Sequence, residues 1–229
     1  GSSGSSGSSG TSGENGISAG QTYYFNESQN SDVSGYKIWD LYPSTASTQT
    51  VTTNLTGSQQ NVLVSDYITP QLGFGVIPGG VQRFSLHYKK GASQSNISTY
   101  AVVQLASQNG DKYYDLGATQ AIAYSNTQEI VWENDNVVNI SLDIISITTE
   151  IQTTDRIVIS LYANNLDTTT QSVSFYTEGT NNYSYVQTST AVVPGPKGAT
   201  GATGATGSPG ATGATGATGS NGDRYSTTS

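Results

Sequence analysis

Apolar and polar residues alternate along several stretches between residues 21 and 193. From residue 81 to residue 88, the side chains of Phe84, Leu86 and Tyr88 are separated by single polar residues. A period of two puts alternate residues on opposite faces of an extended chain, which is the pattern of a half-buried β-strand. By this pattern and by β-branched content, strands are predicted at residues 22–25, 49–55, 62–68, 81–88, 100–105, 112–116, 128–132, 137–142, 144–152, 156–162 and 171–176.

Turn residues separate these stretches. Asn109-Gly110 predicts a hairpin with a primed turn, because this pair readily adopts the positive φ that such a turn needs. About ten short strands, with turns roughly every ten residues and no amphipathic helix longer than two turns, are typical of an all-β domain. We therefore expect residues 19–193 to form a mainly β domain, an antiparallel and jelly-roll-like β-sandwich. Further loops are predicted at residues 69–70, 77–80 and 164–165.

A strict Gly-X-Y repeat occupies residues 194–224. Three polyproline-II chains can wind together only where every third residue lacks a side chain, so the repeat predicts a triple helix of three copies. A flexible glycine-rich linker is the alternative, but a linker has no reason to keep this phase. Residues 225–229 would begin a next segment or a tail. The glycines predicted at the triple-helix axis are Gly195, Gly198, Gly201, Gly204, Gly207, Gly210, Gly213, Gly216, Gly219 and Gly222.

Residues 1–18 carry the same period. The opening Gly-Ser-Ser triplets are also typical of an expression tag, yet the glycine phase continues after the serine runs end, and Glu14 and Ile17 are not linker residues. We interpret this stretch as a second collagen-like segment, so that the trimerising β-sandwich is flanked by triple-helical segments on both sides. Its predicted axis glycines are Gly4, Gly7, Gly10, Gly13 and Gly16.

Both parts of the chain resemble known fibre proteins. Gly195-Pro196-Lys197 and the repeated Gly-Ala-Thr triplets resemble the collagen-like stalks of bacterial, phage and giant-virus surface proteins. Residues 96–100, 154–159, 175–180 and 222–228 resemble phrases that recur in collagen-like fibre proteins of large DNA viruses and phages. The resemblance implies a fibre on a virion or cell surface, and it assigns no catalytic residue.

Composition narrows the range of partners. The chain has a formal net charge of −8, so it is not built to neutralise phosphates, and we expect no nucleic-acid partner. No apolar run reaches about 18 residues, so no membrane insertion is expected. Cysteine is absent, which excludes disulfides and cysteine-based metal sites.

Candidate catalytic groups are few. His87 is the only histidine, and no Gly-x-Ser-x-Gly elbow accompanies it, so a surface or interface role is favoured over that of a general base. The carboxylates are scattered singly and nominate no pair for glycoside hydrolysis. Residues 133–136 could offer oxygen ligands to calcium but lack the spacing of an EF-hand, so a solvated turn is favoured. Asp155-Arg156 is interpreted as a turn or local ion pair at the start of a strand. We therefore expect no enzyme, no metal and no cofactor.

Sugars could enter in two ways. Tyrosines are abundant, and their faces could stack on a glycan or line contacts between subunits; subunit contacts are favoured, because adjacent tyrosines in a strand, such as Tyr23 and Tyr24, point to opposite faces. Five asparagines match the N-glycosylation acceptor: Asn26, Asn54, Asn96, Asn139 and Asn182.

These observations predict a structural homotrimer, a β-sandwich bead that sets the register of collagen-like triple helices in an extracellular, cell-surface or virion-surface filament. The partner is then the chain itself, assembled end to end. The alternative is an adhesin or tail-fibre module that binds a receptor or a host surface glycan, with three copies giving avidity. If both ends of the bead enter triple helices along one straight axis, the first and last strands should leave it at opposite poles.

Overall fold

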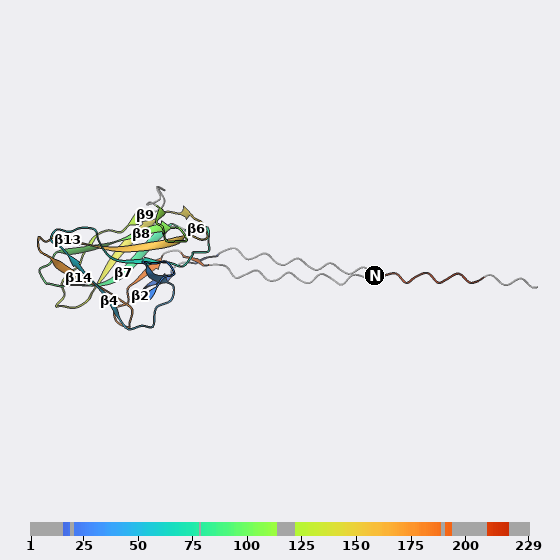
Figure 1. Ribbon diagram of the computed structural model, residues 1–229, viewed down its shortest axis with the longest axis horizontal. Helices are drawn as coiled ribbons and strands as arrows, with labels where there is room; N and C mark the ends of the chain where they lie inside the picture. Colours follow the sequence, from blue (N-terminus) through green and yellow to red (C-terminus); the bar gives the residue numbers. More distant parts are fainter. Residues whose placement is uncertain are drawn as a thin grey trace, which may run out of the picture. The chain divides into compact units, whose positions relative to one another are not determined.

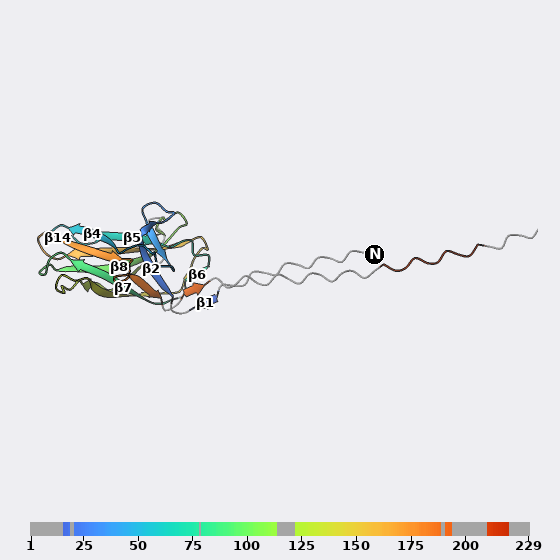
Figure 2. The same ribbon diagram turned by 90° about the horizontal axis from the view of Figure 1, so that it is seen from below.

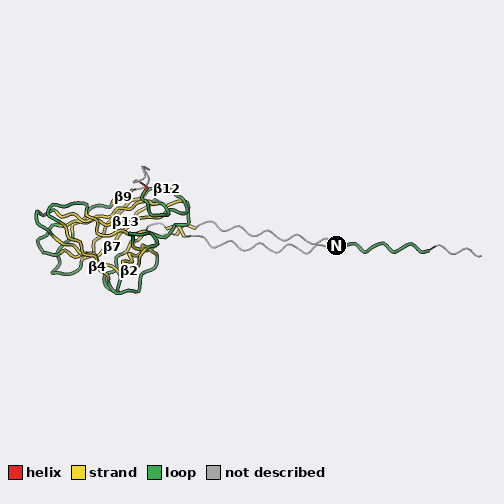
Figure 3. Tube along the Cα trace, viewed as in Figure 1, coloured by secondary structure: helices red, strands yellow, loops and turns green. Residues whose placement is uncertain are grey.

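The computed structural model describes residues 16–18, 21–77, 79–113, 122–188, 191–193 and 210–219. The chain divides into two units, residues 14–195 and residues 1–13 with 196–229, which are treated separately. Strands dominate the described part of residues 14–195 (Figure 3), so the mainly β class predicted from the sequence is confirmed. No helix among the described residues is both long and apolar enough to cross a membrane.

One large sheet holds most of the strands. Its order is β10-β8-β13-β5-β3-β2-β15-β7-β14-β4, with β11 added on β7 and β9 on β8, while β1–β16 and β6–β12 form separate pairs. The strands are β1 (Gly16–Ser18), β2 (Thr22–Asn30), β3 (Lys37–Asp40), β4 (Gln49–Leu55), β5 (Val62–Ile68), β6 (Val76–Ile77), β7 (Gly80–Lys90), β8 (Ile97–Ala106), β9 (Ile122–Tyr124), β10 (Gln128–Glu129), β11 (Val138–Ser146), β12 (Thr149–Glu150), β13 (Arg156–Asn165), β14 (Gln171–Thr177), β15 (Tyr185–Thr188) and β16 (Ala191–Val193).

The sheet is mixed, where the sequence predicted an antiparallel one. β3 pairs with β5 in parallel, with Lys37 opposite Tyr67 and Ile38 opposite Ile68. The strand between them in the sequence, β4, pairs with β14 in the other half of the sheet. After β3 the chain therefore crosses to the other half of the sheet to form β4, and it then comes back to form β5, which runs in the same direction as β3.

The two halves of the sheet face each other across a shared core (Figures 1 and 2). The rings of Tyr67 on β5 and Phe175 on β14 lie 6.4 Å apart, although several strands separate them in the sheet order. Phe84, Leu86 and Tyr88 are fully buried in this core, so the alternation predicted for residues 81–88 is confirmed. Burying such side chains contributes roughly 1.5–3 kcal/mol each.

Two predicted strands and one predicted turn differ clearly from the observed structure. The segment predicted as one strand over residues 144–152 divides, because β11 ends at Ser146 and β12 covers only Thr149–Glu150. Residues 114–116 of the predicted strand 112–116 lie outside the described residues, and Lys112 forms an isolated bridge with Ala106. The turn between them has a positive φ at Gly110 (87°) but not at Asn109, so it is not the primed turn that we expected.

The ends of the globular unit meet. β1 pairs antiparallel with β16, with Gly16 opposite Val193 and Ser18 opposite Ala191. We call this pair the neck. The chain thus enters and leaves at one place, and the prediction of exits at opposite poles is wrong. Gly16, expected at a triple-helix axis, pairs with Val193 in a β-ladder of this chain.

The remaining Gly-X-Y residues are described only over residues 210–219. These residues are exposed and belong to no helix or strand. A Cβ atom placed on Gly213, Gly216 or Gly219 would meet no atom within 4 Å, so nothing in one chain requires these glycines. The other predicted axis glycines, at 4, 7, 10, 13, 195, 198, 201, 204, 207 and 222, lie outside the described residues.

Candidate functional site

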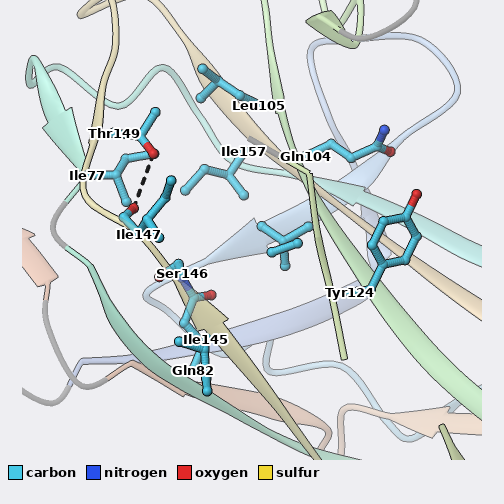
Figure 4. Close-up of a pocket in the computed structure, with 12 residues that line it drawn as sticks. Ile77, Gln82, Gln104, Leu105, Tyr124, Ile145, Ser146, Ile147, Thr149 and Ile157 are labelled. Carbon is cyan, nitrogen blue, oxygen red and sulfur yellow. Dashed lines mark hydrogen bonds between the residues drawn. The ribbon is translucent and has the colours of Figure 1, made fainter. Parts of the chain in front are cut away.

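An apolar groove opens between the two halves of the sheet at one end of the domain (Figure 4). Its volume is about 560 Å³. One wall comes from the ends of β8 and β13, which pair here with Ile157 opposite Leu105. The other comes from β7, from the end of β11 and from the segment that leads to β12. Its aliphatic lining consists of Ile77, Val103, Leu105, Ile145, Ile147 and Ile157.

Gln82 places an unpaired polar atom at this groove. The inward positions of β7 run from Tyr88 through Leu86 and Phe84 to Gln82, so the glutamine takes the next place in an apolar series. Its Oε1 atom is buried and has no hydrogen-bond partner. A buried acceptor without a donor costs about 1–3 kcal/mol. Gln82 ends the alternating stretch 81–88, and a polar residue in an apolar phase is the sequence signal that could have indicated it.

The outer rim of the groove is apolar and exposed. Ile145 and Ile147 each expose 78% of their surface, and Tyr124 exposes 64%. The hydroxyl of Thr149 donates to the carbonyl of Ile147 over 3.1 Å, which closes the bend after β11. Gly79 allows this bend to approach β7, because a Cβ atom there would lie 2.9 Å from the backbone nitrogen of Thr148.

The chemistry of the groove is that of binding. Among the described residues that line it, Tyr124 carries the one titratable side chain, and the polar groups besides it are hydroxyls and the amides of Gln82 and Gln104. Such a lining offers apolar contact and hydrogen bonds to an occupant. It supplies no carboxylate–histidine pair for proton transfer.

His87 lies on the outer face of β7, away from the groove. Its Nε2 is 3.3 Å from Nδ2 of Asn139, and its Nδ1 is 3.5 Å from Oγ of Ser184. Burial lowers the pKa of this imidazole. Sequence reasoning missed Ser184, because 97 residues separate it from His87 and no motif marks it. The serine is fully buried and donates to the carbonyl of Tyr176 over 2.6 Å, so its proton is held away from the imidazole.

The acidic residues singled out in the sequence serve turns and ion pairs. Asn136 donates its backbone N–H to the carbonyl of Glu133 over 2.8 Å, and both central residues, Asn134 and Asp135, have positive φ. Residues 133–136 thus form an exposed tight turn, and Asp135 pairs with Lys89 at 3.0 Å. No group of three metal-ligating side chains occurs in the part of the chain that the structure describes.

Asp155 and Arg156 have different partners. The carboxylate of Asp155 accepts from the backbone N–H of Gln152 over 2.8 Å and from the hydroxyl of Tyr113, whose pKa this hydrogen bond raises to about 12. Arg156 is buried and binds both carboxylate oxygens of Asp32, at 2.9 and 2.6 Å. The ion pair of Arg156 and Asp32 therefore links the start of β13 to the loop between β2 and β3.

The predicted glycosylation sites differ in exposure. Asn54, Asn96 and Asn139 are exposed and Asn182 is half-buried, whereas Asn26 is 1% exposed. The amide of Asn26 donates to the carbonyl of Tyr42 and accepts from the hydroxyl of Tyr183 over 2.6 Å, which leaves no room for a sugar.

The tyrosines of β2 point to opposite faces, as alternation requires. Tyr23 stacks on Trp39 at a ring distance of 4.6 Å. Tyr24 contacts Tyr183 and Tyr185 at 5.2 and 6.4 Å. These last three half-buried rings form one aromatic cluster on the outer face.

Neither a protein-family model nor a curated protein matches this chain. Solved structures do match it. A CocE/NonD family hydrolase from Staphylococcus aureus matches over 78% of this chain and 37% of its own, with a TM-score of 0.51 and 9% identity. An aminopeptidase from a marine sediment Thaumarchaeota archaeon matches over 77% of this chain and 37% of its own, with a TM-score of 0.56 and 8% identity. The chain thus spans little more than a third of the length of these proteins.

These matches correct one expectation. We expected no enzyme, because the sequence contains no recognisable catalytic arrangement. The solved structures contradict that expectation, since the matching proteins are hydrolases and this chain has the fold of a little more than a third of each. At 8–9% identity the likeness shows the fold alone, so it carries over neither a reaction nor a substrate.

Proposed function

We propose that this chain is a homotrimeric fibre module in which a β-sandwich of jelly-roll type sets the register of collagen-like triple helices. The sandwich interpretation is supported by the larger of two hydrophobic clusters, which is enclosed between the two halves of the large sheet. The collagen-like interpretation is supported by glycine at every third residue from Gly195 through Gly222. That repeat is the observation that carries the proposal, because its spacing has a physical purpose only when three chains meet.

The neck changes the predicted geometry of the fibre. The first and last strands of the domain, β1 and β16, pair side by side, with Gly16 opposite Val193. An axis formed by the repeats therefore cannot pass through the domain from pole to pole. In the filament that we propose, the triple helices formed by the two flanking segments lie along one common axis. The three globular domains stand beside this axis, at the point where one triple helix ends and the next begins.

The localisation follows the same proposal. A filament of this kind belongs outside the cell or on the surface of a cell or virion, as the resemblance to collagen-like fibre proteins implies. Its partners are further copies of the chain, assembled end to end.

The mass of the native protein tests the proposal, together with circular dichroism during a thermal scan. We expect three times 23.8 kDa and the positive band of a triple helix, lost cooperatively on heating. Replacing Gly213 by Ala should lower this transition, because the axis has no room for a methyl group. Replacing the neighbouring Ala214 by Ser is the matched control and should leave the transition nearly unchanged. A single chain without the band would contradict the proposal.

A glycan-binding adhesin is the second candidate. It is favoured by the outer cluster of Tyr24, Tyr183 and Tyr185, since aromatic faces with a polar edge suit sugars. Three domains displayed beside an axis would bind a surface with avidity. A glycan array tests this: binding that Tyr24→Ala abolishes supports the adhesin, and an array without signal opposes it.

A further inference from the structure

We infer that the apolar groove is a subunit contact, occupied in the assembled protein by a second copy of this chain. The inference deepens the proposed function and rests on it, because it requires that three chains assemble. It adds the surface through which the globular domains hold one another.

The groove lies beside the point where the chains must meet. β6 supplies Ile77 to the groove, and β16 of the neck contacts β6. Figure 2 places β1 and β6 at the same end of the globular part. When the Gly-X-Y repeats of three chains join, their necks are drawn together. The surface beside the neck then faces the neighbouring copies.

The exposed isoleucines indicate the size of the occupant. Ile145 and Ile147 are each 78% exposed, so a small molecule that filled the hollow would leave most of this apolar surface in water. A neighbouring protein domain covers the hollow and its rim together. Val81, directly opposite Ile145 on the paired strand, extends the same apolar surface.

Charge also favours a second copy. Each chain carries a formal net charge of −8, so copies repel one another over most of their surface. None of the described residues that line the groove is charged at neutral pH. The neighbouring ion pair of Arg83 and Asp143 is internally balanced at 2.8 Å. Two copies can therefore approach here without bringing like charges together.

The geometry suits a ring. In a closed threefold assembly each copy presents two different surfaces, one to each neighbour. The rim at Ile145 and Ile147 protrudes and the hollow beside it recedes.

Single-cysteine labelling of the full chain tests this contact directly, because the natural sequence contains no cysteine. We expect Ile147→Cys to react with a maleimide at least about tenfold more slowly in the assembled protein than in the dissociated one, since interface cores exclude water. Leu166→Cys is the control. Leu166 is 51% exposed and lies just beyond the end of β13 that is farther from the groove. A ten-residue strand spans about 30 Å, which separates Leu166 from the groove end of β13. It should label equally fast in both states.

A charge substitution gives the second readout. Ile145→Lys should lower the midpoint of the triple-helix transition, because the globular domains would no longer hold the three chains together. Leu166→Lys should not change it. Near-ultraviolet circular dichroism of both variants checks that the domain is folded.

The outcomes separate the two proposals. If the unsubstituted chain is a single chain without the triple-helix band, the proposed function fails. If it is a trimer, but Ile147→Cys labels as fast in the trimer as Leu166→Cys does, the proposed function stands and the subunit contact is overturned. Equally slow labelling at Ile147 in trimer and single chain also overturns it, because part of the same chain would then cover the groove.

Discussion

The two ends of the globular domain are built differently. At the far end, where β4 and β13 end and β8 begins, polar groups satisfy one another within a single chain. The buried amide of Asn165 donates to the carbonyls of Leu55, Thr56 and Thr169 at 3.1, 2.9 and 2.8 Å. At the neck end, by contrast, isoleucines are exposed and the buried amide oxygen of Gln82 has no donor. At the far end the amide of Asn165 is hydrogen-bonded within one chain, whereas the neck end exposes apolar side chains and holds an unpaired amide oxygen.

The difference shows how one sheet can stabilise the domain at one end and keep an apolar surface exposed at the other. The far end provides stability that does not depend on concentration. The neck end retains apolar surface that costs free energy in a single chain, and in the assembly that we propose a partner would cover this surface and recover that free energy. A strand such as β13 joins the two, because one of its ends holds Asn165 and the other holds Ile157.

The largest effect on stability is expected at the far end. Replacing Asn165 by Ala removes the two N–H donors that three backbone carbonyls share, and also the oxygen that accepts from the backbone N–H of Asp167. The loss should cost about 3 kcal/mol, which lowers the melting temperature by roughly 6–12 °C in a domain of this size. Asn164→Ala is the matched control. Asn164 is half-buried and accepts one bond from the backbone of Asn61, so about 1 kcal/mol is expected. Thermal unfolding followed by near-ultraviolet circular dichroism measures both, and equal losses would contradict the comparison.

The importance of Asn165 illustrates what the sequence does and does not indicate. Asn164-Asn165 predicts a loop, and a loop does begin there, but nothing local indicates that the second asparagine is buried while the first is not. Local pattern predicted the strands at 49–55 and 62–68 to the residue, because both are seven-residue stretches that contain β-branched residues. The four-residue strands β3 and β15 were missed, since so few residues show no period.

The candidate site was beyond local pattern altogether. The groove requires that Gln82, Leu105 and Ile147 meet, and they come from segments that only tertiary packing brings together. The adjacency of β1 and β16 is of the same kind. The glycine period, in contrast, is visible in the sequence, and within one chain the described glycines Gly213, Gly216 and Gly219 have no close contact that requires them.

The next largest effect concerns the pair of Asp32 and Arg156. It lies at the end of β13 that also lines the groove, so it tests whether the neck end is weak in general. Asp32→Asn leaves a buried guanidinium without its carboxylate, although two backbone carbonyls still accept from it. A cost of about 1–2 kcal/mol is expected, limited because the carboxylate is 69% exposed and screened by water. Urea unfolding at neutral pH measures it.

Acid provides the control for this pair. The hydrogen bond from Arg156 lowers the pKa of Asp32 below its ordinary value. The stability gained from the pair is therefore present above the unfolded pKa, near 4, and is lost as pH falls through the folded value. The difference between the natural chain and Asp32→Asn should shrink as pH drops below about 4. A difference that stays constant would mean that the substitution acts through packing instead.

A smaller effect is expected at His87, between the two ends. Burial lowers its pKa, so the folded domain favours the neutral imidazole. Stability should be highest above the unfolded pKa of about 6.5 and should fall as pH drops through it, because the unfolded chain then binds the proton more readily. His87→Gln should flatten this part of the pH profile. Melting temperatures at pH 7.5 and 5.5 measure it, and an unchanged slope would contradict it.

The smallest effect on the single chain is expected at the exposed rim. Ile144 and Ile145 are neighbours on β11 with opposite fates, 1% and 78% exposed. Ile145→Thr keeps a β-branched residue in the strand and should change the unfolding free energy of the dissociated chain by less than about 0.5 kcal/mol. Ile144→Thr puts a hydroxyl into the core and should cost about 2–4 kcal/mol. Urea titrations at a dilution where mass measurements find single chains compare the two. If Ile145→Thr is neutral there yet weakens the trimer, the isoleucine serves the contact between chains and not the fold; a large loss in the single chain would place it with the core instead.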